Sequence, residues 1–127
     1  MKVKTLICNC KNQDPFRLAD MNSLPFDIES ELDVAYAAVH PQLCGPGGKE
    51  LLEDVLRSAE DDPDTFVVVC ACDEPTQRKL FRKVVQNAEV DEKQLVPVDA
   101  RNTTNDGILE RIRERLHELA NPKKRRH

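Results

Sequence analysis

The fold is decided by the stretch Phe66-Val67-Val68-Val69-Cys70-Ala71, which is continuously apolar over the length of one strand. Apolar residues on both faces of a strand are typical of a parallel sheet that helices cover on both sides. The stretch is followed directly by Cys72, so the strand would carry Cys70 and Cys72 to its carboxyl end. We therefore start from a buried parallel strand that ends in two cysteines.

Three further strands are expected around this one. Residues 3–7 form a short apolar, β-branched segment that ends at Cys8, with Cys10 just beyond it. Residues 31–39 alternate between apolar and polar, which is the period of a strand, and His40 and Pro41 end the pattern. Residues 95–98 supply a fourth short strand.

Amphipathic helices are expected between and after the strands. Apolar residues recur at helical spacing in three segments: Leu51, Leu52, Val55, Leu56 and Ala59; Leu80, Phe81, Val84 and Val85; and Ile108, Leu109, Ile112, Leu116 and Leu119. The second of these helices would begin near Pro75, and the third would have Asn105 as its N-cap. Residues 11–30 are expected to be mostly loop, because Pro15 and Pro25 interrupt any pattern there.

Alternating strands and helices predict an α/β fold with a small, right-handed, mostly parallel sheet of about four strands, of flavodoxin-like type. We expect one domain over residues 1–122 and a basic tail over residues 123–127. In such a sheet, sites gather where the carboxyl ends of the strands meet, here called the carboxyl edge, and where strand order reverses between the first and third strands. All five cysteines map to this edge.

Composition narrows the function classes. The 19 Lys and Arg residues against 23 Asp and Glu residues give a net charge of -4, so nucleic acid is not an expected partner. The longest apolar runs are too short for membrane insertion, and no signal-peptide pattern begins the chain, so we expect a cytoplasmic protein. Five cysteines in an intracellular chain indicate metal or redox chemistry, since intracellular thiols are normally kept reduced.

Four thiolates suit either a tetrahedral zinc ion or an iron–sulfur cluster. A zinc site would make the chain a structural interaction domain, and a third alternative is sulfur or disulfide exchange by the Cys70 and Cys72 pair. His40 is a reserve ligand, because it lies four residues before Cys44. Glycines after Cys44 would let the amides at a helix start approach an anionic cluster, although a tight turn explains them equally well.

Two nucleotide- or phosphate-linked activities are disfavoured. The segment that ends at Glu50 lacks the spacing of a nucleotide-binding P-loop. Cys72 and Arg78 have the spacing used by thiol phosphatases, but Asp73 and Glu74 would repel a phosphate and Pro75 removes an amide that should bind it. We therefore expect neither nucleotide hydrolysis nor phosphatase activity.

The pattern Cys8-Asn9-Cys10, a lone Cys44, an apolar strand before Cys72 with Pro75 after it, and Arg101 after the fourth strand carries a resemblance. Over roughly residues 5–119 the chain resembles the N-terminal iron–sulfur domain found in the flavin-containing polypeptide of heterodisulfide reductase. The order and spacing of the cysteines are the specific feature of this likeness. In this chain the segment after Cys10 looks shorter and less helical than in that family.

The resemblance implies an α/β domain with a 4Fe-4S cluster that relays electrons to or from a flavin in an adjoining domain. It also implies the cluster ligands, which are Cys8, Cys10, Cys44 and Cys72, with Cys70 as an extra cysteine or as a replacement for Cys72. No Gly-x-Gly-x-x-Gly segment follows. We therefore expect an electron-transfer component rather than an enzyme by itself, with a redox partner in another polypeptide, such as a flavoprotein or other subunits of a larger complex.

Overall fold

The computed structural model describes residues 1–9 and 18–121. Its four strands, β1 (Lys2–Cys8), β2 (Tyr36–His40), β3 (Thr65–Ala71) and β4 (Leu95–Asp99), are all parallel and stand in the order β2-β1-β3-β4. The helices are α1 (Leu24–Glu31), α2 (Pro46–Arg57), α3 (Glu74–Leu80), α4 (Arg82–Ala88), the 3₁₀ helix η3 (Glu92–Gln94) and α5 (Asn105–Ala120). The α/β fold predicted from the sequence is confirmed.

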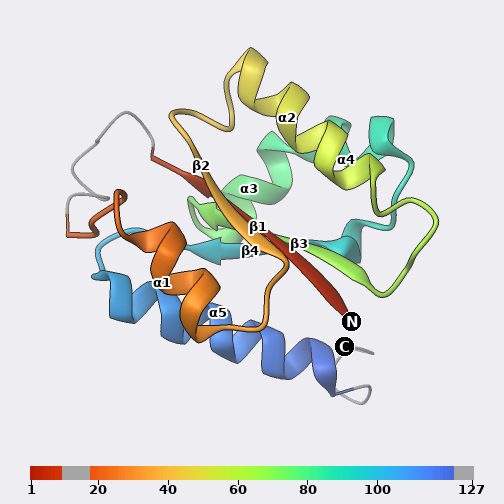
Figure 1. Ribbon diagram of the computed structural model, residues 1–127. Coiled ribbons are helices and arrows are strands. Elements are labelled where there is room, and N and C mark those ends of the chain that lie inside the picture. The colour runs from red at the N-terminus through yellow and green to blue at the C-terminus, as the bar shows by residue number, and fades with distance from the viewer. Residues whose placement is uncertain (10–17, 122–127) are drawn as a thin grey trace.

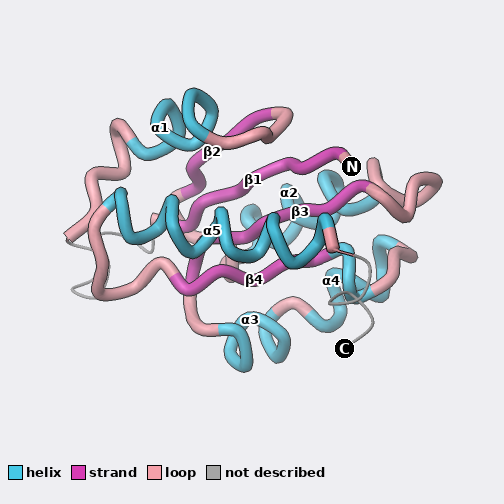
Figure 2. The backbone as a smooth tube through the Cα atoms, turned by 90° about the horizontal axis from the view of Figure 1, so that it is seen from below, coloured by secondary structure: helices cyan, strands magenta, loops and turns pink. Residues whose placement is uncertain are grey.

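The helices form a layer on each side of the sheet. In Figure 1, α2 and α4 lie together on one face and α1 and α5 lie on the other. Figure 2 shows α5 running along the sheet beneath its central strands. All seven residues of β3 are buried, as the apolar stretch predicted, because β3 is paired on both edges and covered on both faces. None of the described helices is long and apolar enough to cross a membrane.

The strand order decides where the site lies. The chain passes from β1 to β2 in one direction and then returns to place β3 on the other side of β1. The reversal between β1 and β3 is therefore where the sequence predicted it. In sheets of this kind, the crevice at such a reversal is the common place for a bound group.

One helix was missed because Pro25 was taken as an interruption. The prediction of loop through residue 30 is wrong over α1, where Pro25 lies in the first turn. The absent N–H of a proline costs nothing at that position. Leu24 and Ile28, four residues apart, are buried on the same side of the helix.

Three boundaries also differ from the prediction. The strand expected from residue 31 begins only at Tyr36, since α1 extends to Glu31. The helix expected through residue 85 is divided into α3 and α4 at Phe81, whose φ of -107° and ψ of 10° interrupt it. The N-cap of α5 is Thr104, whose hydroxyl accepts a hydrogen bond from Gly107 N, and not Asn105.

Candidate functional site at the carboxyl edge

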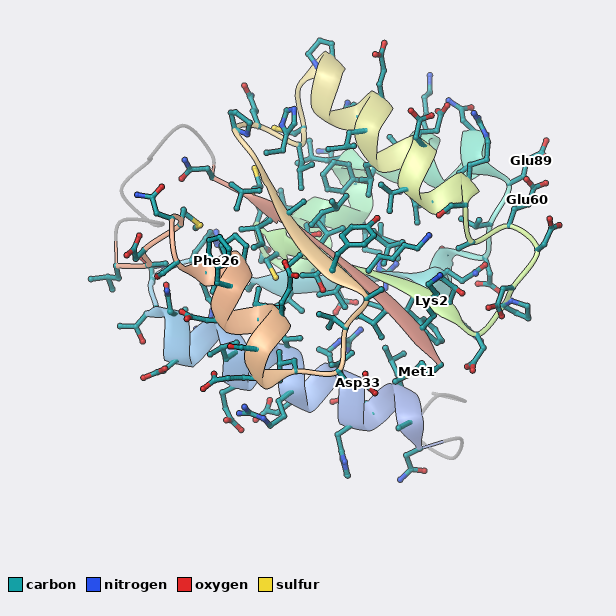
Figure 3. The ribbon with its side chains drawn as sticks, viewed as in Figure 1. Met1, Lys2, Phe26, Asp33, Glu60 and Glu89 are labelled. Carbon is teal, nitrogen blue, oxygen red and sulfur yellow. The ribbon has the colours of Figure 1, made fainter. Side chains whose placement is uncertain are left out.

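Three of the expected ligands meet at the carboxyl edge. Cys8 is the last residue of β1, Cys44 directly precedes the N-cap of α2, and Cys72 directly follows β3. Met1 and Lys2, labelled in Figure 3, mark the opposite, amino end of β1. Cys10 and the basic tail lie outside the described residues. The sheet thus carries the three described thiols to one end of the molecule.

The three sulfurs are close enough to interact electrostatically. The pKa of Cys72 is raised above its ordinary value, first by burial and then by the negative charge of Cys8, with a further contribution from Cys44. The Arg101 guanidinium opposes these effects. Each thiolate would therefore be held more easily if a cation or a metal centre shared the space between them.

Hydrogen-bond donors already reach two of the sulfurs. The backbone N–H of Leu43 donates to Cys8 Sγ at 3.4 Å, and Gln42 Nε2 lies 3.5 Å from Cys44 Sγ. Cys8 is 2% exposed, whereas Cys44 is half-buried. Because N–H donors stabilise negative charge on a sulfur, these contacts favour the thiolate form that binds metals.

The loop that carries Cys44 is packed tightly onto the start of α2. A side-chain carbon at Gly48 would collide with the backbone of Gln42 and Leu43. Gly47, by contrast, has open space around its Cα. Gly48 is therefore needed for close packing of the Leu43 segment, which in turn contacts Cys8 through its N–H.

His40 is poorly suited to the role of reserve ligand. Its Nδ1 accepts a hydrogen bond from the backbone N–H of Gln42 at 3.0 Å. A neutral imidazole with Nδ1 as acceptor carries its proton on Nε2, so neither nitrogen offers a lone pair to a metal. In this arrangement His40 fixes the turn after β2 instead.

Cys70 belongs to the hydrophobic core. Its side chain is fully buried, it pairs with Ile7 and Val98 in the sheet, and burial raises the pKa of its thiol to about 12. A thiol in such surroundings stays protonated and inert. Burial therefore favours Cys72 over Cys70 as a ligand, and it argues against thiol exchange by this pair.

A firmly held arginine stands beside Cys72. Arg101 makes two contacts of 3.0 Å with the carboxylate of Asp99, and its Nη2 lies 3.7 Å from Asp73 Oδ1. Arg111 Nη1 donates to the carbonyls of Asp99 and Arg101, which ties this loop to α5. The positive charge that acts on Cys72 is thus held in place by contacts from several segments.

Arg78, in contrast, does not join Cys72 in a phosphate-binding loop. Its Nη1 donates to the carbonyls of Glu92 and Leu95, at the amino end of β4. This end of the strand is opposite to the carboxyl edge. The side chain that the cysteine-to-arginine spacing would require is therefore engaged elsewhere.

Gln77 is a residue of the site that sequence reasoning missed. It is fully buried in α3, and its amide nitrogen donates to the carbonyl of Cys72 at 2.7 Å. The available signal was its position four residues before Phe81, which puts a polar amide on the core-facing side of the helix. A polar residue on such a face indicates a specific hydrogen-bonding role.

Within residues 1–9 and 18–121, no three His, Cys, Asp or Glu side chains form a group that could hold a metal ion. The fourth sulfur of the expected set, that of Cys10, lies outside these ranges. Comparison of the chain with protein-family models and with curated proteins finds no match. The functional assignment therefore depends on the cysteines and their surroundings.

Proposed function

We propose that this protein binds a 4Fe-4S cluster through Cys8, Cys10, Cys44 and Cys72 and serves in electron transfer. The observation that carries the proposal is the meeting of Cys8, Cys44 and Cys72, from three separate segments, at the reversal point of a parallel sheet. The proposal also draws on the resemblance to the iron–sulfur domain of heterodisulfide reductase.

The residues present fit such a group. All four donors are thiols, which are the ligands that iron–sulfur clusters use. Donors at Leu43 N and Gln42 Nε2 reach two of the sulfurs, and hydrogen bonds to cluster sulfurs are a known means of setting the potential. When bound, the cluster supplies a centre that accepts and releases an electron.

The chain's own residues would bind the cluster, limit its contact with water and balance its charge. Cys8 is buried against Leu43, whereas Cys44 and Cys72 are half-buried and so lie nearer the surface. Arg101, fixed by Asp99, provides positive charge beside Cys72. We propose that electrons pass to or from a redox protein in another polypeptide, such as a flavoprotein or a further member of a complex.

The direct test is anaerobic purification followed by analysis of iron, acid-labile sulfide and zinc, with absorption spectra before and after dithionite. About four irons and four sulfides per chain, with a broad visible band that bleaches on reduction, are expected. One zinc ion and no colour would replace the proposal with a structural zinc site, and a metal-free protein would refute both.

A pair of cysteine variants tests the choice of ligands. Cys72→Ser should lose most of the bound iron, because an alcohol replaces a thiolate ligand. Cys70→Ala should keep it, because Cys70 is enclosed in the core and protonated. Iron content, measured after the same reconstitution of both variants, decides between them. Loss of iron from Cys70→Ala with retention in Cys72→Ser would overturn the assignment.

A further inference from the structure

The side chain of Gln77 joins three segments at the carboxyl edge. Its Nε2 donates to the carbonyl oxygen of Cys72 at 2.7 Å, of Val69 at 3.1 Å and of Val98 at 3.3 Å. Val69 and Val98 belong to β3 and β4, and Cys72 starts the turn between β3 and α3. One amide from α3 therefore fastens the turn to the ends of two strands.

The contact with Cys72 is the shortest of the three. An amide NH₂ has two hydrogens, so at least one of them is shared between acceptors, and the shortest contact takes the best-directed share. Gln77 is also anchored through its own backbone, because its N–H donates to the carbonyl of Asp73 at 3.0 Å. The peptide that follows Cys72 is thus held from both the side chain and the backbone of Gln77.

This amide is retained at a cost. Gln77 is fully buried, and its Oε1 has no hydrogen-bond partner in the described structure. A buried acceptor without a donor is unfavourable, and a neighbour on the same helical face, Phe81, is apolar. Packing alone would be served equally well by an apolar side chain. The three carbonyl contacts are therefore what the glutamine supplies.

We propose that Gln77 is the positioning residue for Cys72, holding its peptide so that the thiol stays beside Cys8 and Cys44. The identity of Cys72 as a cluster ligand rests on the proposed function. The positioning of its thiol, however, is a property of the metal-free chain and is tested without any cluster.

The experiment compares rates of thiol alkylation at individual cysteines in the reduced, metal-free, full-length chain. N-ethylmaleimide is added anaerobically, and labelling at Cys44, Cys70 and Cys72 is followed by peptide mass spectrometry. The variant is Gln77→Met, which removes the amide but keeps a side chain of similar length. The matched control is Gln86→Met, since Gln86 is an exposed glutamine on α4.

In Gln77→Met, labelling of Cys72 should accelerate about tenfold relative to Cys44, the ratio that loss of one buried hydrogen bond implies. Loosening exposes the thiol and takes it away from Cys8, and both changes speed the reaction. Cys70, which is fully buried, reports on general opening and should stay slow. Gln86→Met should leave all three rates unchanged.

Two results would overturn the inference. One is an unchanged ratio of Cys72 to Cys44 labelling in a folded Gln77→Met chain. The other is a joint rise at Cys70 and Cys72, which would make Gln77 a general core residue. If Gln77→Met does not fold, Gln77→Asn, which draws the amide back by one carbon, should give the same selective rise. Failure of both variants to fold would also count against a positioning role.

Reconstitution separates this inference from the proposed function. If the wild-type chain takes up no iron but Gln77→Met still shows selective Cys72 labelling, then the proposed cluster fails and the positioning role stands. If the wild-type chain takes up iron and the labelling ratio does not change, then the reverse holds. The supporting result in a cluster-binding chain is a shifted reduction potential for Gln77→Met and an unshifted one for Gln86→Met.

Discussion

Substitution of Gly48 by alanine provides the sharpest test of how the Cys44 loop is built. A Cβ at Gly48 would lie 2.7 Å from the carbonyl carbon of Leu43 and still closer to Gln42 O and Leu43 Cα. Ordinary carbon contacts are roughly 3.5 to 4.0 Å, so the loop would have to retreat by about 1 Å. All three contacted atoms belong to the backbone, so no side-chain rotation relieves the collision.

The magnitude follows from two opposing effects. Overpacking of a closely packed segment costs about 1–3 kcal/mol, while replacing a helical glycine by alanine gains at most about 1 kcal/mol. Gly48→Ala should therefore lower the free energy of unfolding by about 1–2 kcal/mol. Gly47→Ala has open space at the corresponding Cβ and should leave stability unchanged or raise it by less than about 1 kcal/mol.

Urea unfolding of the metal-free chain, followed by circular dichroism, measures both variants against the wild type. The two glycines are neighbours in the same helical turn, so helix propensity affects them similarly. A Gly48→Ala chain as stable as Gly47→Ala would refute the reasoning, because the Leu43 segment would then not depend on a close approach to α2.

Two further predictions concern the polar contacts of the loops. Burial alone would raise the pKa of Asp99, but hydrogen bonds from the side chain and backbone of Arg101 outweigh it and lower the pKa below its usual value of 3.8. The resulting stability is present above that value and is lost as the pH falls through the lowered pKa, so the stability gap between wild type and Asp99→Asn should narrow from about pH 6 to about pH 2.5; a constant gap in urea unfolding would contradict this. Asn105 links α5 to the segment before α1 and to α1 itself through Asp20, Ser23 and Asp27. Asn105→Ala should cost about 1–3 kcal/mol and speed amide hydrogen exchange in α1, whereas Asn87→Ala on the exposed side of α4 should do neither.

The strands were predictable where burial leaves a one-dimensional signal. β3 is apolar at nearly every position because it is covered on both faces, and most of the central strand β1 is buried in the same way. α2 and α5 were predictable from the helical recurrence of Leu52, Leu56, Ile108 and Ile112, all of them fully buried. In these elements, local pattern and tertiary packing point to the same structure.

The elements that the sequence misassigned depend on context. Pro25 is compatible with a helix only in its first turn, and nothing local to the chain says where that turn begins. The alternation at Leu32 and Val34 arises because both side chains pack against the core outside any strand. Phe81 lies in a continuous helical pattern, although its backbone conformation divides that pattern into α3 and α4.

The amino-acid sequence by itself determined the strands that carry Cys8 and Cys72 and the order of alternating elements, because periodicity and apolar runs are local properties. Tertiary structure alone decided which cysteines share a space. Cys70 and Cys72 are two residues apart, yet burial encloses one in the core and leaves the other half-buried beside Arg101. The roles of Gly48 and Gln77 likewise depend on distant backbone atoms, since close approach and hydrogen bonding across segments exist only after the chain has folded.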